Sequence, residues 1–578
     1  MNALEAASLV MIPSGYEDGT LGSLKPLDGT GDFTFSRGSN ISATRVNADG
    51  NIEKGYENLL LQSNTFSDAV WTKSSTSVTS SQTGYDGSSD AWLLSKSGAN
   101  GRIQFNLSTG GVSVLSVYAK ANISNYIVIQ FQSTFAYFDL TTGLAQNETS
   151  GIISATSTDE GNGWYRCSIV FNISASSTCY IYPAENGSVS ATSGSIYIQD
   201  AMLNQGLVAY PYIETTTAPV AGGILEDMPR LDWSGSCPSL LLEPSRTNLL
   251  GYSEYFEAWH TDRNVSYTAN STISPEGLIN ATKLTATNTI DAYVRDNRSS
   301  SAGNNVFSVF AKYEDCQYIS LSTRFFIGGD EARVWFDIQN GVKGSSTEDE
   351  VTYDIEDYGN GWYRCYVIFN IDAGDTNGYS FVYLSNADSS INVTSGTSAH
   401  LYGGQWEVGS YPTSYIPTYG VSQTRLADVC SKDNISGLIN SPDGVFYNEV
   451  FLESTPLTGN RHLIVRGDAS NYVNVYFDTI GSIVARIKVA GVDTFLATPI
   501  TQVQNKVAIL WQANKYALFV NGVKAAENLS GATFPAGTLN KIDFDNVNSN
   551  TPFYGEVKQT LLFPTALSDE ACIELTTI

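Results

Sequence analysis

The chain has 578 residues, enough for three or four domains that each bury a core of their own. Its formal net charge of −27 disfavours a nucleic-acid-binding surface and electrostatic docking on an anionic membrane. Hydrophobic residues make up 42% of the chain and charged residues only 15%, which excludes a disordered chain and is typical of all-β domains. The acidic balance favours solubility at high copy number, with an acidic functional patch as the alternative.

The first 57 residues are rich in turn signals. Asp28-Gly29 and Asp49-Gly50 are examples, and no series of strands here is long enough for a core. We therefore expect residues 1–57 to form an extended, irregular arm that anchors the chain on another subunit or on its own first module. The N-terminus lacks the basic start of a secretory signal peptide and no segment reaches the length of a membrane span, so we expect synthesis in a cytoplasm.

One phrase, Gly-Asn-Gly-Trp-Tyr-Arg-Cys, occurs twice, at residues 161–167 and 359–365, and each copy leads into an apolar, strand-like run. Other paired segments keep nearly the same offset, namely 113–120 with 306–312 and 136–143 with 334–341. A repeat of this length indicates a duplicated domain rather than a solenoid unit. We predict two antiparallel jelly-roll β-sandwiches with the same strand order, over residues 58–216 and 247–418.

We expect the residues of the repeated phrase to have structural roles. We expect Trp164 and Trp362, which begin a strand, to lie in the sandwich core; the alternative is an exposed platform on which a sugar ring stacks. Arg166 and Arg364 are expected to form hydrogen-bonded clamps on a neighbouring turn. The glycines on either side of the Asn are expected to supply turn positions with positive φ. These glycines are Gly161, Gly163, Gly359 and Gly361.

The chain has seven cysteines, an odd number. Cys167 and Cys365 occupy equivalent positions of the repeat. We expect both to be buried as small apolar side chains rather than joined in disulfides.

Residues 217–246, between the two modules, are too apolar for a free linker, and we expect them to pack against a neighbouring module. Residues 427–578 have a different pattern and predict a third domain. Asn521-Gly522 is typical of a hairpin turn, and residues 566–575 predict a helix with Ser568 as its N-cap. Alternating apolar residues predict half-buried strands at 444–452, 471–477, 506–511 and 515–520.

Several phrases of this third domain are characteristic. They are Tyr-Ala-Leu-Phe-Val-Asn-Gly-Val at 516–523, Tyr-Gly-Glu-Val at 554–557, Phe563, and Leu-Ser-Asp-Glu at 567–570. Together they resemble the concanavalin A-like, or laminin G-like, jelly roll. The resemblance implies a lectin-type β-sandwich and leaves open whether it binds sugar, binds protein or only packs.

A second resemblance rests on the Gly-Asn-Gly-Trp-Tyr-Arg phrases, on residues 236–250 and on Ser-Ala-Thr-Arg-Val-Asn at 42–47. The repeats are similar to the carbohydrate-binding-module-like jelly rolls of tailed-bacteriophage structural proteins. The resemblance implies a virion protein, in a head fibre, a tail fibre or a decoration. It also implies contact with other virion proteins through the N-terminal arm and a homo-oligomer, without nucleic acid or membrane insertion.

The sequence gives little support for catalytic activity. His260, His400 and His462 are scattered among different segments, and neither a nucleophile elbow nor a phosphate-binding glycine loop occurs. Two carboxylates at the right separation could hydrolyse a glycosidic bond. The acidic candidates lie at 226–227, 348–350 and 354–357, where solvated loop positions are the simpler interpretation. We assign no catalytic, cofactor-binding or metal-binding residue.

A structural calcium ion is the one cofactor that the resemblance leaves open, because jelly rolls of this type often hold one. The candidate is Asp-Gly-Ser-Ser-Asp at 86–90, which is dense in oxygen atoms but lacks the spacing of a known calcium loop. We therefore favour a plain turn.

The sequence thus predicts a non-enzymatic bacteriophage virion protein, a fibre or decoration, that attaches reversibly to glycans of the bacterial surface. Weak single sites would gain avidity from many copies on one particle. The alternative is a purely structural protein whose lectin-like modules bind no sugar, and a third hypothesis is a polysaccharide depolymerase.

Overall fold

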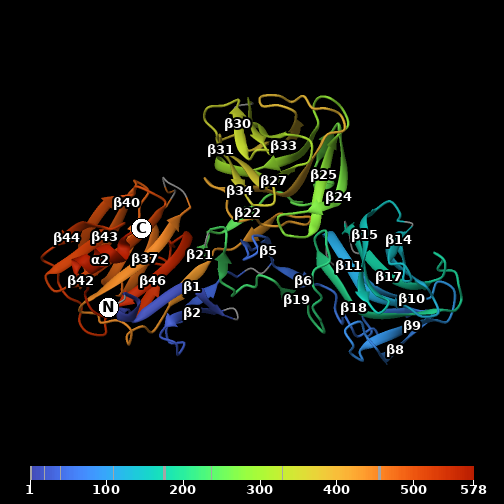
Figure 1. Ribbon diagram of the computed structural model, residues 1–578, viewed down its shortest axis with the longest axis horizontal. Coiled ribbons are helices and arrows are strands. Elements are labelled where there is room, and N and C mark those ends of the chain that lie inside the picture. The colour runs from blue at the N-terminus through green and yellow to red at the C-terminus, as the bar shows by residue number, and fades with distance from the viewer. Residues whose placement is uncertain are drawn as a thin grey trace.

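The structure is a computed structural model that describes residues 3–17, 20–38, 41–107, 110–146, 148–173, 177–235, 237–327, 330–453, 457 and 459–578. Ser236, part of a phrase discussed above, lies outside these residues. Antiparallel strands form almost all of the regular structure, arranged in three β-rich lobes that meet near the middle (Figure 1). The predicted all-β class is therefore confirmed. None of the helices in these ranges is long and apolar enough to cross a membrane.

The first module, the blue-green lobe at the right of Figure 1, is a sandwich of two sheets. Its strands are β7 (Thr72–Ser74), β8 (Thr76–Gln82), β9 (Ala91–Lys96), β10 (Arg102–Leu107), β11 (Gly111–Ala121), β12 (Tyr126–Phe131), β13 (Thr134–Asp139), β14 (Leu144–Gln146), β15 (Ile152–Gly161), β16 (Trp164–Ile173), β17 (Ser177–Ala184) and β18 (Ser195–Gln205). The sheet orders are β8-β9-β18-β11-β16-β15 and β7-β10-β17-β12-β13-β14.

The second module, the green and yellow lobe at the top of Figure 1, has the same architecture. A 3-10 helix, η1 (Phe256–Ala258), precedes β23 (Thr261–Arg263), β24 (Val265–Ile273), β25 (Ile279–Ala286), β26 (Tyr293–Ser299), β27 (Gly303–Tyr313), β28 (Tyr318–Ile327), β29 (Asp330–Asp337), β30 (Val342–Ser346), β31 (Thr352–Asp357), β32 (Trp362–Ile371), β33 (Asn377–Ser385) and β34 (Ser398–Val408). The sheet orders are β24-β25-β34-β27-β32-β31 and β23-β26-β33-β28-β29-β30.

The two modules correspond strand for strand, with the same order in both sheets. The register is also shared: Lys120 pairs with Trp164 between β11 and β16, and Lys312 pairs with Trp362 between β27 and β32. The expected duplication therefore extends from sequence phrases to strand order and hydrogen-bond register.

The repeated phrase forms a tight loop and then a buried tryptophan. All the glycines of both copies have positive φ, as expected, and so does the Asn between them. Trp164 and Trp362 are 2% and 1% exposed, so both are buried as predicted. Their location differs from the prediction, because each lies in a cluster on the outer face of its sheet. Residues three apart on a strand point to opposite faces, so Cys167, in the core, and Trp164 cannot share one.

The third lobe, orange and red at the left of Figure 1, combines the end of the chain with segments from its beginning. One sheet has the order β2-β1-β46-β37-β42-β43-β44, with β21 also on β46 and β20 on β21. Its strands are β1 (Leu9–Glu17), β2 (Thr20–Lys25), β20 (Arg230–Asp232), β21 (Ser239–Leu242), β37 (Gly444–Leu452), β42 (Gln504–Gln512), β43 (Lys515–Val520), β44 (Val523–Asn528) and β46 (Gly555–Phe563).

The second sheet of this lobe has the order β3-β36-β45-β38-β39-β40-β41. These strands are β3 (Thr34–Ser36), β36 (Val429–Lys432), β38 (Arg461–Asp468), β39 (Asn471–Phe477), β40 (Ser482–Val489), β41 (Val492–Pro499) and β45 (Lys541–Asp543). Asn521 and Gly522 connect β43 to β44 as the predicted hairpin turn. The predicted helix is α2 (Asp569–Thr576), whose first turn is capped by Ser568 Oγ; α1 (Ala3–Ala6) lies near the N-terminus.

The N-terminal arm corrects one expectation. Leu9–Glu17 and Thr20–Lys25 are regular strands rather than irregular chain. They extend the sheet of the third lobe, because β1 pairs with β2 and, through Val10 and Leu561, with β46. Leu9 and Met11 point to the same face of β1, and both are fully buried in the core of this lobe. The short strands that follow are β4 (Thr44–Val46), β5 (Ile52–Lys54) and β6 (Tyr56–Asn58), and β6 pairs with β19 (Val220–Gly222).

The lobes meet around a buried ionic network. Arg230, in the connector, pairs with Glu243 and Asp428, and Arg425 also pairs with Glu243. Arg37, from the arm, pairs with Asp428. Nearby, β22 (Arg246–Asn248) pairs with β35 (Gln423–Arg425). The arm, the connector and the start of the third domain are thus joined through charges that are removed from water.

Candidate functional site

The outer face of the sheet β23-β26-β33-β28-β29-β30 carries an ordered grid of side chains. Alternate residues of a strand share a face, and the apolar residues between them, such as Val294 and Val382, lie in the core. The strand register therefore defines three rows across β26, β33, β28 and β29. The rows are Tyr293, Tyr383, Ser320, Trp335; then Arg295, Phe381, Ser322, Arg333; then Asn297, Tyr379, Arg324, Glu331.

The two arginines of the central row lie over aromatic rings. Arg333 Cζ lies 4.3 Å from the ring centroid of Tyr383, and Arg295 Cζ lies 4.4 Å from that of Tyr379. A guanidinium stacked in this way keeps its N–H groups in its own plane, so its edge still offers donors to an acceptor. The stacking also limits the conformations of both side chains before any ligand arrives.

Among the described residues, each of these guanidinium groups donates a single side-chain hydrogen bond. Arg333 Nη2 donates to Glu331 Oε1 at 2.5 Å, and Arg295 Nη2 donates to Thr261 Oγ1 at 3.0 Å. The Nε atoms of both arginines have no hydrogen-bond partner among the described residues. These Nε atoms are buried, so the donors open to an anionic or hydroxylated ligand are the remaining Nη groups.

The first module has a different face at the same positions. Its central row contains Gln104, Tyr180, Gln130 and Phe135, so Gln104 corresponds to Arg295 and Phe135 to Arg333. Arg102 is the arginine that stacks on the aromatic residues of this face, 5.1 Å from the ring centroid of Tyr180. The two arginines Arg295 and Arg333 thus distinguish the second module from the first, which has the same strand order.

This grid was not among the sites predicted from the sequence, although the sequence carries a signal for it. Tyr293 and Arg295 on β26, and Arg333 and Trp335 on β29, alternate aromatic and basic residues on the strand face opposite the apolar one. Such alternation indicates a sheet face that is not part of the core. Only strand order brings the two arginines into one row.

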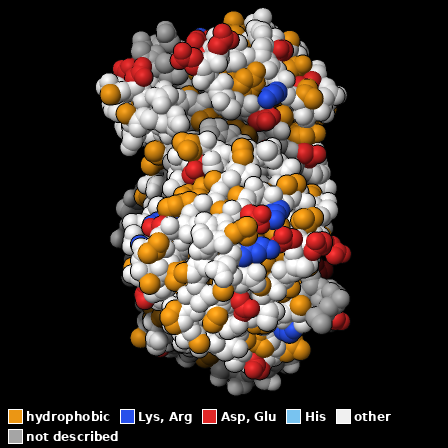
Figure 2. Space-filling view, turned by 90° about the vertical axis from the view of Figure 1, so that its left-hand side faces the viewer, with side chains coloured by type: hydrophobic (Ala, Val, Ile, Leu, Met, Phe, Trp, Pro, Cys, Tyr) orange, Lys and Arg blue, Asp and Glu red, His pale blue; other side chains and the backbone are white. Residues whose placement is uncertain are grey.

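The surface around the lobes is mainly acidic and neutral. In Figure 2, acidic and apolar side chains are scattered over the visible face with few basic ones between them, in keeping with the net charge of −27. A row with two arginines is therefore a local departure from the charge of the chain.

The calcium candidate at 86–90 is a turn organised by a side-chain amide. Gln199 Nε2 donates to Asp86 Oδ1 at 3.3 Å and to Asp90 Oδ1 at 2.8 Å, so an amide N–H occupies the position that a cation would take. Nowhere in the described ranges does a group of three or more His, Cys, Asp or Glu side chains form a potential metal site. The geometry favours the plain turn.

The three histidines lie in separate environments. His400, on β34, contacts Glu314 at 2.9 Å in the second module. His462, on β38 of the third lobe, is hydrogen-bonded to Asn474, and burial lowers its pKa to about 4. His260 lies between η1 and β23. The structure therefore does not bring these residues together. Of the acidic runs, Glu356 and Asp357 line a cavity that is described below.

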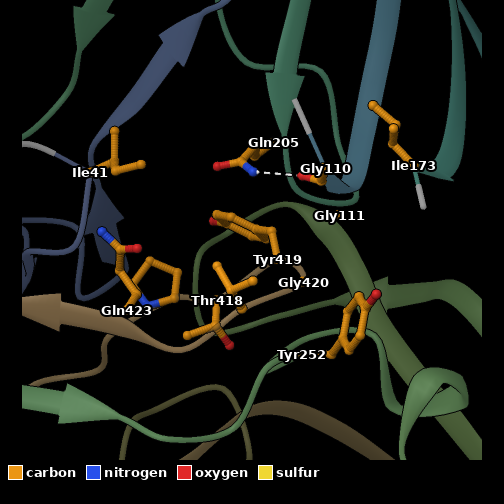
Figure 3. Close-up of a pocket in the computed structure, with 12 residues that line it drawn as sticks. Ile41, Gly110, Gly111, Ile173, Gln205, Tyr252, Thr418, Tyr419, Gly420 and Gln423 are labelled. Carbon is orange, nitrogen blue, oxygen red and sulfur yellow. Dashed lines mark hydrogen bonds between the residues drawn. The ribbon is translucent and has the colours of Figure 1, made fainter. Parts of the chain in front are cut away.

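A cavity of about 520 Å³ lies between the first and second modules, beside a backbone contact that links them (Figure 3). Val112 N donates to Tyr419 O at 2.6 Å, and Gln205 Nε2 donates to Gly110 O at 3.1 Å. The side chains that Figure 3 labels carry no charge, and much of the lining is backbone at Gly111 and Gly420. This cavity is best described as a joint between two modules.

No protein-family model and no curated protein sequence matches the chain. Among solved structures, the Ruminococcus gnavus IT-sialidase CBM40 bound to alpha2,3 sialyllactose matches with a TM-score of 0.22 and 19% identity, over 25% of this chain and 91% of that one. Domains LG4-5 of the mouse laminin alpha1 chain match with a TM-score of 0.18 and 10% identity, over 49% and 91%. Trypanosoma rangeli sialidase in complex with the inhibitor DANA matches with a TM-score of 0.19 and 9% identity, over 93% and 96%.

These structures include carbohydrate-binding-module and laminin G-like domains, the two classes of β-sandwich that the sequence resembles. Similarity of this size carries no argument about what this chain binds. None of the three is a bacteriophage protein, and a virion role stays a prediction from the sequence.

Proposed function

We propose that this protein binds glycans that carry a carboxylate, through the outer face of β26, β33, β28 and β29 in its second module. The observation that carries the proposal is the central row, in which Arg295 and Arg333 flank Phe381 and Ser322. Two guanidinium groups on one face of a strongly acidic chain are a specific arrangement, because the net charge would otherwise repel an acidic ligand.

Each part of the face has a role in such recognition. A guanidinium matches the two oxygens of a carboxylate, and the stacked position of Arg295 and Arg333 reduces the conformational entropy that binding removes. The rings of Tyr379 and Tyr293, both half-buried, offer apolar surface to the face of a sugar ring. Glu331 can accept a hydroxyl or amide N–H of the ligand. Phe381 and Ser322, between the two arginines, are 4% and 0% exposed, so the row offers a ligand little accessible surface. A single site therefore binds weakly and gains strength from several copies.

The proposed role is binding without catalysis. Hydrolysis of a glycosidic bond uses two carboxylates that flank the bond, whereas the three rows of the face contain only Glu331. Its Oε1 already accepts from Arg333 Nη2 and from Ser322 Oγ. The three rows hold no second carboxylate that could act together with Glu331.

Attachment of a bacteriophage particle to its host is the context that the sequence phrases at 42–47 and 236–250 suggest for this binding. Strands β1 and β2 are hydrogen-bonded within the chain's own third lobe, so anchoring through residues 9–25 is not part of the proposal. A purely structural protein without sugar binding is the competing function, and the buried joints between arm, connector and lobes favour it.

The test uses the first module as a guide to substitution. The variant Arg295→Gln with Arg333→Phe places on the second module the residues that the first module carries at the same positions. Binding of the full chain to sialyllactose, to a glucuronate-containing oligosaccharide and to neutral lactose would be measured by calorimetry and, in a multimeric form, on a glycan array. We expect the intact chain to bind the acidic sugars, and the variant to bind them at least about tenfold more weakly, since one charged hydrogen bond is worth about 1.5–3 kcal/mol.

The matched control is Arg102→Gln on the first module, which should leave binding unchanged. Equal binding of lactose and sialyllactose, or undiminished binding by the double variant, would contradict the proposed site. Absence of binding to any acidic glycan by the multimer would favour the structural function.

A further inference from the structure

A second cavity, of about 460 Å³, lies where the second module, the connector and the third lobe meet. Its size is within the range of small-molecule sites, which is about 300–1,000 Å³. The residues on which the argument depends are Asp232, Trp233, Glu356, Asp357, Arg364 and Glu556. They come from the end of β20, from β31 and β32, and from β46, so the cavity exists only when these three parts of the chain are assembled.

The cavity has an excess of carboxylates. Asp232 accepts from the backbone N of Val46 and of Ser234, and Glu243, also in the lining, is neutralised by Arg230 and Arg425. Asp357 accepts from Gly359 N at 2.7 Å. These contacts satisfy part of the negative charge, and most of them come from backbone groups or from ion pairs behind the cavity wall.

Two carboxylates of the lining form no ion pair with a described side chain, although Arg364 near Glu356 and Lys558 near Glu556 act to lower the pKa of these groups. Glu356 has no hydrogen bond and no ion pair within the described part of the chain, and Glu556 accepts only from Ser239 Oγ, at 2.6 Å. Both are half-buried, and burial raises the pKa of each. Burial outweighs the nearby cation at each carboxylate, so a further positive charge in the cavity would stabilise both of them.

The remaining wall offers an aromatic surface and a buried donor. Trp233 is 39% exposed, unlike Trp164 or Trp362, so its ring is accessible. Arg364 is 2% exposed; its Nη2 donates to Ser308 Oγ at 3.2 Å, and its Nε has no hydrogen-bond partner among the residues described. The cavity thus combines negative charge, an indole face and an unsatisfied donor.

We infer that this junction cavity binds a protonated amine carried on a small hydroxylated ring, such as an unacetylated amino sugar. The ammonium group supplies the direct ion-pair partner that Glu356 and Glu556 lack, and the apolar face of the ring stacks on Trp233. Hydroxyl groups donate to Asp232 and Asp357, and a ring or hydroxyl oxygen accepts from Arg364. A metal ion is the competing cation, but no metal-binding group of three or more side chains occurs in the described residues.

This site is chemically opposite to the arginine row and independent of it. The row uses guanidinium groups of β26 and β29 to hold an acid, while the cavity uses carboxylates of β31 and β46 to hold a base. Because the cavity wall comes from three parts of the chain, an amine bound there also stabilises their assembly, by an amount that grows with ligand concentration.

The experiment measures binding of glucosamine to the full chain by calorimetry and by thermal shift, with N-acetylglucosamine and glucose as uncharged analogues of the same ring. We expect glucosamine alone to bind and to raise the unfolding midpoint. The variant Glu356→Gln with Glu556→Gln should weaken glucosamine binding by at least about tenfold, and Trp233→Ala should also weaken it.

Two controls separate this inference from misfolding and from the proposed function. The double glutamine variant should unfold at the same temperature as the unchanged chain or higher in the absence of ligand, because it removes two half-buried charges that form no ion pair. Arg295→Gln with Arg333→Phe should bind glucosamine normally. Equal binding of glucosamine and N-acetylglucosamine, retained binding by the double glutamine variant, or stabilisation by Ca²⁺ that displaces glucosamine would overturn the inference.

Discussion

Lys54 Nζ lies 2.7 Å from Glu254 Oε1, and both side chains are buried. Lys54 belongs to the N-terminal arm and Glu254 to the second module. Glu276 Oε2 lies 2.9 Å from the same nitrogen, and the ring of Tyr402 lies beside it. Burial alone would lower the pKa of Lys54, but the two glutamates raise it well above its ordinary value. One lysine therefore joins the arm to the second module by satisfying two buried acids.

Replacing Lys54 with Met leaves Glu254 and Glu276 buried without a counter-charge. We expect this to lower the free energy of unfolding by about 3–5 kcal/mol at neutral pH, as for other buried pairs that lose one partner. Chemical denaturation of the full chain would measure the change. Arg45→Met, in the more exposed pair with Glu53, is the control and should cost at most about 1 kcal/mol. A loss at Lys54 no larger than that of the control would show that the pair is not important for stability.

Gly111 and Gly303 begin equivalent strands, with φ of +90° and +102°, yet only one of them touches another module. A Cβ at Gly111 would lie 1.7 Å from Tyr419 O, whereas a Cβ at Gly303 would meet nothing within 4 Å. We expect Gly111→Ala to open the joint between the modules, seen as a larger radius of gyration in small-angle scattering. Gly303→Ala should cost only the local strain, about 1–2 kcal/mol, without a change of shape. Identical scattering from the two variants would argue against a tight joint.

Trp164 and Trp362 should be structural, because both are almost fully buried. Substituting either with Ala should lower the free energy of unfolding by about 3–5 kcal/mol. The effect should be larger at Trp362, whose cluster is also covered by Ile52 of the arm. Trp233→Ala, at an exposed indole, is the matched control and should change stability little. The measurement is denaturant unfolding of the full chain, and a small effect at Trp164 together with lost glycan binding would instead support the platform alternative.

Asp200 should make the first module less stable as the pH rises. Burial, with a contribution from Asp90 and Asp86, raises its pKa to about 7. The folded state then holds a proton that the unfolded state releases near pH 4, so stability is fully present below about pH 4 and declines as the pH rises through 7. Asp200→Asn keeps the shape and removes this dependence, and its advantage at pH 8 should be about 2–4 kcal/mol.

The check is unfolding of both proteins at several pH values between 4 and 8. The left-handed backbone of Asp200, with φ of +49°, is one that Asn also adopts, so the substitution adds no strain. Parallel pH curves for the two proteins would show that Asp200 is ionised in the fold.

Local patterns in the sequence were sufficient for the elements that depend on near neighbours. Alternating apolar residues predicted the strands, Asn521-Gly522 predicted a hairpin turn, and Ser568 predicted the start of a helix, each confirmed by the structure. The repeated phrase predicted a duplicated module, and it appears as the same strand order twice. These features depend on backbone preferences and side-chain period within a few residues.

Tertiary structure alone decided the partners of distant segments. No local pattern predicts that β1 pairs with β46, because the backbone of an edge strand can form hydrogen bonds with any free edge. The pairing partner of β1 is set by the core in which Leu9 and Met11 are buried. The strand period separates Trp164 from Cys167, but which of the two faces becomes the core follows from how the sheets pack. Arg295 and Arg333 share a row only because β33 and β28 lie between their strands in a fixed register. The sequence by itself determined the modules and their strands, while long-range packing determined strand neighbours, and with them which side chains meet on one face.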